Sequence, residues 1–125
     1  MHKPKLDRAP TCGVSIALEV LGGKWKACLI HGIRNGQRRP SELHCLNSTA
    51  PPRVLNQQLN ELVAHGMVRK VIYPVLPPKA EYFLTSQGES LLAIVDAMEA
   101  WGTSHGGELW TQLATGADHN QLGRP

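Results

Sequence analysis

The stretch from Arg38 to Thr85 constrains the fold of this chain most, because two short helical patterns follow each other across a polar turn. The first helix is expected to begin at Ser41, a favourable N-cap residue. The second begins near Pro52, whose fixed φ suits the first helical position, and Gly66 ends it. Its apolar residues recur at helical spacing and predict one buried stripe, Leu55, Leu59, Leu62 and Val63.

A charged β-hairpin is expected directly after these helices. Residues 67–74 and 81–85 are rich in β-branched and aromatic side chains and enclose a tip at 75–80. Two prolines stiffen the tip and Lys79 adds a cation there, as in a wing that lies along a DNA strand or minor groove. An ordinary surface hairpin fits the same residues. The order of helix, turn, helix and hairpin predicts a winged helix-turn-helix, an α+β fold that is mainly α.

The second helix of the pair is predicted to show solvent a face that suits DNA. With successive residues about 100° apart, the side opposite the apolar stripe holds Arg53, Gln57, Asn60 and Glu61, with Asn56 at its edge. Arginine can donate twice to a guanine edge, and Asn or Gln matches the donor and acceptor of adenine. Ordinary solvated helices carry such residues too, but their position in a helix-turn-helix favours base reading.

The charge distribution agrees with a nucleic-acid partner. The net charge is only +3, yet residues 1–85 hold twelve Lys or Arg against five acids, and residues 86–125 hold one against five. The two parts therefore carry +7 and −4. A basic front part suits contact with phosphates, whereas the acidic rear part suits something else.

No motif points to an enzyme, a cofactor or a metal. The three cysteines and six histidines lack zinc spacing, and no phosphate loop, paired-carboxylate site or nucleophile motif is present. Residues 1–10 lack the apolar core of a signal peptide, and no apolar run is long enough to span a bilayer. We therefore expect a cytoplasmic protein without membrane contact. Residues 1–11 are expected to form a flexible basic arm.

Two further helices are expected upstream. The first carries an apolar stripe with Val14 and Leu18 and ends at a glycine pair, residues 22–23. The second runs from about Lys24 to Arg34 and ends at residues 35–36. Lys24 and Lys26 near its start serve either phosphate contact or solubility. The predicted buried stripe of this helix is Trp25, Cys28, Leu29 and Ile33.

The last long helix is expected to begin at Ser86, with Thr85 as a rival cap, and to end near His105. Its apolar face is broader than the small core beside it needs, so self-association is the natural use, with folding back onto its own domain as the alternative. Residues 106–125 are expected to form a partly flexible extension. The expected dimer contacts from the first and last helices are Val14, Leu18, Ile94, Met98 and Trp101.

Between Cys12 and His105 the sequence resembles the HxlR family of bacterial winged-helix transcriptional regulators. The marks of the resemblance, in chain order, are Gly22-Gly23-Lys24-Trp25-Lys26, Arg38-Arg39-Pro40-Ser41-Glu42-Leu43, Arg53-Val54-Leu55, Leu59-x-x-Leu62, Tyr73-Pro74, Pro77-Pro78-Lys79-x-Glu81-Tyr82-x-Leu84-Thr85, Gly88 and Trp101-Gly102. The chain has Pro40 and Pro51 where the family commonly has an aromatic residue and a serine, and Cys12-Gly13 where it often has Cys-Pro.

The resemblance implies a homodimer, joined by its N- and C-terminal helices, that reads a pseudo-palindromic operator in double-stranded DNA and represses or activates nearby genes. It also implies that Cys12 senses oxidants or electrophiles. A separate physical argument agrees, because a cysteine at a helix start next to a basic arm favours the thiolate. A packing role for Cys12, and Cys45 as the reactive thiol, stay open. Two alternative functions stay open. One is a winged-helix module that binds protein or RNA, and the other is a small-molecule-binding or thiol-reactive protein without DNA affinity. The candidate DNA contacts are Lys24, Arg38, Arg39, Ser41, Arg53, Asn56, Gln57, Asn60 and Lys79.

Overall fold

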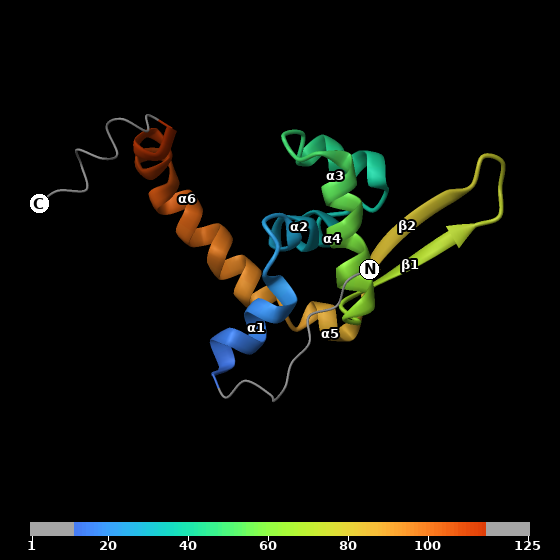
Figure 1. Cartoon of the computed structure of the whole chain (residues 1–125), viewed down its shortest axis with the longest axis horizontal. Coiled ribbons are helices and arrows are strands. Elements are labelled where there is room, and N and C mark those ends of the chain that lie inside the picture. The colour runs from blue at the N-terminus through green and yellow to red at the C-terminus, as the bar shows by residue number, and fades with distance from the viewer. Residues whose placement is uncertain (1–11, 115–125) are drawn as a thin grey trace, which may run out of the picture. The chain divides into compact units, whose positions relative to one another are not determined.

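The computed structural model describes residues 12–114 and contains two compact units, residues 1–90 and 91–125. The second unit contains one described helix, α6 (Leu92–Ala114). The order of elements confirms the predicted winged helix-turn-helix. Along the first unit (Figure 1) these elements are α1 (Gly13–Leu21), α2 (Lys26–Arg34), α3 (Pro40–Leu46), α4 (Pro52–Ala64), β1 (Val68–Tyr73), β2 (Lys79–Leu84) and α5 (Ser86–Glu89).

The core of the first unit lies where α2, α3 and α4 meet one another and the two strands. The α4 stripe is confirmed for three of its four members, whereas Val63 is only half-buried. Full burial of an aliphatic side chain stabilises a fold by about 1.5–3 kcal/mol, so this cluster holds the helix-turn-helix together. Its most deeply buried apolar residues include Leu29, Ile30, Ile33, Leu43, Leu55, Leu59, Leu62, Val68 and Tyr82.

The hairpin is an antiparallel pair whose register runs from Val68 opposite Leu84 to Tyr73 opposite Lys79. Lys79 is therefore the first residue of β2, and its expected position in the tip is wrong. The residues of the tip are 74–78, and Leu76 there is 96% exposed. The hairpin follows Gly66, whose φ of +79° lies in the left-handed region that glycine tolerates.

The helix α3 begins at Pro40 with Arg39 as its N-cap residue, so the predicted cap at Ser41 is wrong. The carboxylate of Glu42 replaces the expected hydroxyl. Its Oε1 accepts from the backbone N–H groups of Arg38 and Arg39, at 3.0 and 3.1 Å. These bonds satisfy donors that the start of a helix leaves unpaired.

The expected buried stripe of α2 is confirmed at Leu29 and Ile33, whereas Trp25 is only half-buried and Cys28 is wrong. Cys28 is exposed, and Ile30 is fully buried instead, together with the predicted Leu29 and Ile33. The helix begins at Lys26 rather than Lys24, and Trp25 is its half-buried N-cap residue. The alternation of apolar and small residues over nine positions did not fix which side faces inward.

The single helix expected from Ser86 to His105 is divided into α5 and α6. Thr85 is the N-cap residue of α5: its Oγ1 accepts from the backbone N–H of Gly88 at 3.0 Å and donates to the carbonyl oxygen of Gly66 at 2.6 Å. After α5, the hydroxyl of Ser90 donates to the backbone carbonyl of Gln87. Local side-chain bonds of this kind compete with the helical ladder, which accounts for the break.

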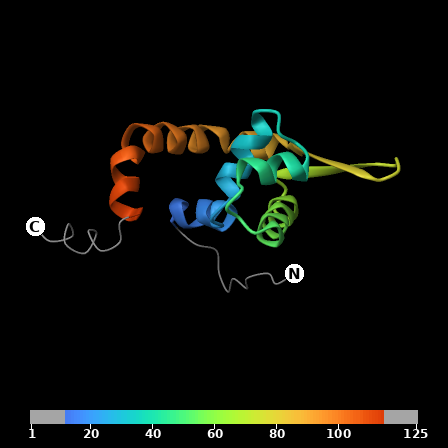
Figure 2. The same ribbon diagram turned by 90° about the horizontal axis from the view of Figure 1, so that it is seen from above.

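The second unit differs from the predicted extension, because α6 continues through residues 106 and 107 to Ala114. Figure 2 shows α6 changing direction where the colour deepens from orange to red. Gly106 and Gly107 lie in the C-terminal half of this helix. Small-residue pairs are a common cause of such bends. Within residues 12–114, no helix combines the length and the hydrophobicity that crossing a membrane requires.

Candidate nucleic-acid interface

Four of the predicted base-reading side chains lie exposed on α4. They are Arg53, Asn56, Gln57 and Asn60, and the leucines of the core occupy the other side of the helix. One side of α4 therefore exposes guanidinium and amide groups to solvent. These groups match base edges in a major groove, which is wide enough for an α-helix.

Glu61 does not belong to this exposed face, contrary to the prediction. Its Oε1 lies 2.7 Å from Nζ of Lys26, and the two side chains are 23% and 6% exposed. The hydrogen bond from Lys26, supported by its charge and by Gln57, lowers the pKa of the Glu61 carboxyl. Lys26 is therefore committed to an internal ion pair, and the expectation of phosphate contact or solubility is wrong for it.

Gln58 is a second anchor of α4 that the sequence analysis missed. Its Oε1 accepts from the backbone N–H of Trp25 at 2.8 Å. A Cβ placed on Gly23 would lie 2.5 Å from the same oxygen, so a larger residue at this position would displace the Gln58 amide from its bond to Trp25. The only sequence signal was the glycine pair before a tryptophan. Lys24 remains exposed, with Nζ 5.2 Å from the centre of the Trp25 ring.

The start of α3 carries three of the candidate DNA contacts. Ser41 is exposed in the first turn. Arg39 has a half-exposed side chain whose Nε lies 3.9 Å from a carboxylate oxygen of Glu81 on β2. The backbone N–H groups of Arg39 and Arg38 donate to the Glu42 carboxylate, which lowers the pKa of this carboxyl and keeps it ionised at the helix start. Arg38, the third candidate, packs against the wing.

Two guanidinium groups stack on one aromatic ring at the base of the wing. The Cζ atoms of Arg38 and Arg69 lie 5.0 and 4.9 Å from the centre of the Phe83 ring. Nε of Arg38 is buried without a hydrogen-bond partner. Cation–π contacts hold these cations in place while their outer nitrogens can still donate to an anion. The wing therefore presents positive charge at its base.

The far half of the wing combines a cation with an ordered polar pair. Lys79 is exposed beside the tip. Opposite it on β1, the hydroxyl of Tyr73 donates to Oε1 of Glu81 at 2.9 Å, and this bond raises the pKa of the tyrosine. This bond joins the two strands of the wing close to the proline-rich tip.

Cys12, the candidate sensor, is the exposed N-cap residue of α1. The backbone N–H groups of Ser15 and Val14, then the Ser15 side chain, lower the pKa of its thiol. This agrees with the physical argument for a thiolate at a helix start. The basic arm that was expected to add to the effect, with Lys3, Lys5 and Arg8, lies outside the described residues. Cys45 on α3 is also exposed.

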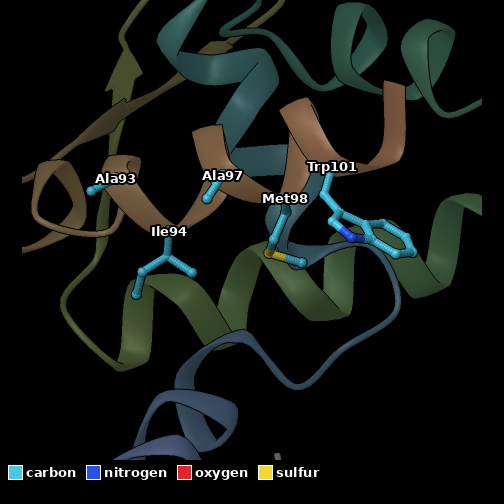
Figure 3. A pocket seen from close by; sticks show the side chains of 5 residues that line it. All are labelled: Ala93, Ile94, Ala97, Met98 and Trp101. Carbon is cyan, nitrogen blue, oxygen red and sulfur yellow. The ribbon is translucent and has the colours of Figure 1, made fainter. Parts of the chain in front are cut away.

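The candidate dimer residues are all exposed and apolar. In α1 no side chain is buried, and Val14 and Leu18 are 68% and 58% exposed. On α6, Ile94 and Met98 project from one side of the helix (Figure 3), and Trp101 continues the same apolar surface. The rings of Trp101 and His105 stack, with centroids 4.6 Å apart. An open, mainly apolar pocket on this side of α6 is lined by Ala93, Ile94, Ala97, Met98 and Trp101.

A helix-turn-helix with an exposed polar second helix and a basic wing is the architecture of DNA-binding transcriptional regulators. The chain belongs to the HxlR-like helix-turn-helix family, whose model matches residues 20–109. Its relatives are transcriptional regulators, not enzymes. In residues 12–114, no three His, Cys, Asp or Glu side chains gather as a metal site would require.

Individual relatives support this assignment. The HTH-type transcriptional regulator YtcD of Bacillus subtilis is 42% identical over 92 residues, which are 74% of this chain and 73% of YtcD. The crystal structure of YtcD covers 76% of this chain and 97% of that one, with a TM-score of 0.70. The oxidized form of the redox regulator HypR is 41% identical, covers 74% of this chain and 96% of that one, and has a TM-score of 0.71. The reduced transcriptional regulator YodB of B. subtilis is 29% identical, covers 74% and 92%, and has a TM-score of 0.62.

Proposed function

We propose that this regulator binds a pseudo-palindromic operator as a homodimer, with α4 of each subunit in a major groove and the wing on the flanking backbone. The observation that carries the proposal is the exposed set of Arg53, Asn56, Gln57 and Asn60 on one side of α4. Arg38 and Arg69, which lie over the Phe83 ring at the foot of the wing, supply an attraction to phosphates that does not depend on the DNA sequence.

Selection of bound fragments from genomic DNA tests the proposal directly, because it measures binding and identifies the operator in one experiment. Enrichment of fragments that share an inverted repeat is expected, since a symmetric dimer reads two equivalent half-sites. The selected duplex should be bound with a steep salt dependence. Failure to enrich any DNA fragment would contradict it and favour a protein- or RNA-binding use of the same surface.

Base reading and backbone contact are separated by two variants. Arg53→Ala is expected to cost about 1–3 kcal/mol on the operator and to relax base preference at one position of each half-site. Lys79→Ala should weaken binding to all duplexes and lower the salt slope by about one unit per contacting side chain. Arg34→Ala, an exposed arginine on α2, is the control for the loss of one positive charge. Equal loss of specific and non-specific affinity in Arg53→Ala would exclude base reading by that residue.

Self-association is proposed through the exposed apolar surfaces of α1 and α6. The residues are Val14 and Leu18 on α1 and Ile94, Met98 and Trp101 on α6, each at least 42% exposed. A symmetric dimer buries the same residues on both subunits and holds two recognition helices at a fixed spacing. Operator affinity should therefore depend on dimer formation, because two linked half-sites bind together.

We further propose that Cys12 switches the regulator in response to oxidants or electrophiles. Its exposure and lowered thiol pKa support this role, and the related HypR is a redox regulator. Modification would act on α1, one of the helices proposed to form the dimer, and so would change the spacing of the recognition helices.

Operator affinity after treatment with a quinone or diamide tests the switch. A quinone adds to one thiolate, whereas diamide oxidises two thiols to a disulfide and is itself reduced. Wild type should lose affinity for the operator, Cys12→Ser should keep it, and Cys45→Ser is the matched control. An equal response of wild type and Cys12→Ser would exclude Cys12 as the switch.

A further inference from the structure

The side of α4 next to the exposed base-reading face is tied to the start of α2 at two points, the N-cap residue Trp25 and the first helical residue Lys26. Gln58 accepts from the backbone N–H of Trp25 at 2.8 Å, and Glu61 pairs with Lys26 at 2.7 Å. The two anchors on α4 are three residues apart, so they lie on the same side of the helix and about 4.5 Å apart along its axis. Two fixed points restrain both the rotation of α4 about its axis and its position along that axis.

The chemistry of the ion pair favours a role in orientation rather than in stability. The side chain of Lys26 is 6% exposed, so its ammonium group has lost most of its water. The cost of removing two charges from water offsets much of their attraction, and apolar replacements of a buried pair are often neutral or stabilising. What a buried pair of this kind provides is one allowed arrangement of the elements that it joins.

The same carboxylate also reaches the proposed DNA-reading face. Oε2 of Glu61 accepts from the side-chain amide of Gln57 at 3.5 Å, while Oε1 holds Lys26. Gln57 is exposed and is one of the four candidate base contacts. The position of its amide group is thus linked to the buried ammonium through one carboxylate.

From these contacts we infer that Lys26, Gln58 and Glu61 are positioning residues for operator recognition. They hold α4 at one rotation relative to the start of α2 and restrain the amide of Gln57, and they do not themselves contact DNA. This inference rests on the proposed function and adds to it the residues that determine how the recognition helix is presented.

The double variant Lys26→Met with Glu61→Leu is the sharpest test. It removes one positive and one negative charge, so the net charge and the general attraction to DNA are unchanged. Because the replacements are apolar and similar in length, the protein is expected to fold, which circular dichroism and thermal melting would verify. Affinity for the selected operator should fall about tenfold, the order expected for one misplaced base contact, whereas affinity for an unrelated duplex and the salt slope stay at wild-type values.

A second variant addresses the other anchor without touching a charge. Gln58→Met should likewise lower operator affinity and spare non-specific binding. Gln87→Met makes the same chemical change on an exposed glutamine of α5 and should leave both affinities unchanged. Gln57→Ala should have little further effect in the Lys26→Met, Glu61→Leu background, because the two changes disturb the same contact.

The outcomes separate this inference from the proposed function. Folded variants at both anchors that bind the operator with wild-type affinity and specificity would overturn the positioning role and leave operator binding intact. Equal loss of specific and non-specific affinity would also overturn it, because misorientation of α4 should spare contacts with the backbone. Failure of the wild-type protein to select any DNA would overturn the proposed function itself.

Discussion

Replacement of Met98 by alanine is expected to weaken self-association of the chain by about 10- to 150-fold. Full burial of a methionine side chain contributes about 1.5–3 kcal/mol. Met98 is 52% exposed, so burial of this exposed part in a dimer contributes about 0.8–1.6 kcal/mol per subunit. A two-fold symmetric interface contains the residue twice, which gives about 1.6–3.1 kcal/mol, at about 1.4 kcal/mol per factor of ten in Kd. Since alanine retains Cβ, the lower part of the range is expected.

Sedimentation equilibrium over a concentration series measures the dimer constant directly. Ile72→Ala is the matched control, because Ile72 on β1 is an apolar side chain of similar exposure, 63%, outside the proposed interface. Met98→Glu should go further and give folded monomers that lose operator binding far more than stability, because two half-sites are then no longer bound together. A wild-type protein that stays monomeric at micromolar concentration, or an unchanged dimer constant in Met98→Ala, would refute the assignment of this face of α6.

Three further predictions concern stability and the wing. Leu59→Ala, at a side chain that is 1% exposed, should lower the free energy of unfolding by about 2–5 kcal/mol in urea titrations with an unchanged m-value. Phe83→Leu removes the ring on which two guanidinium groups stack and should weaken binding to any duplex several-fold, as measured by fluorescence anisotropy; an unchanged affinity would contradict a role for these cations. Because the pKa of Glu61 is lowered by folding, its contribution to stability is present above the unfolded value of about 4.3 and is lost as pH falls through the folded value. The urea midpoint of wild type should therefore fall more between about pH 5 and pH 3 than that of the variant with Lys26→Met and Glu61→Leu, and parallel pH curves would contradict this.

Local periodicity was sufficient to predict the elements that bury one clear face. The leucine spacing of α4 identified its buried side, and Gly66 was correctly predicted to end it, with a φ that only glycine adopts readily. The order of helix, turn, helix and hairpin then determined the fold class, because few folds use that sequence of elements.

Pairings between distant residues could not be predicted in the same way. Lys26 and Glu61 are far apart in sequence, so their ion pair exists only after α2 and α4 have packed, and each residue alone resembled a solvated charge. The exposure of Cys28 was missed because a nine-residue helix with small and apolar residues on several sides has no dominant apolar stripe. The extension of α6 through two glycines was missed because each costs a helix only about 1 kcal/mol, which is not a reliable stop.

The division of α4 into anchored and unanchored positions has a consequence for how regulators of this kind diverge. Arg53, Asn56 and Asn60 face outward, and no contact described above ties them to the rest of the protein. Mutations at these positions can alter the preferred DNA sequence while the helix stays in place, whereas a change at Gln58 or Glu61 alters the position of the helix that carries all three. Duplicated copies of such a gene should therefore acquire new operators mainly through substitutions at Arg53, Asn56 and Asn60. Gln58 and Glu61 should stay the same, because they hold helices with different base-reading residues in the same position.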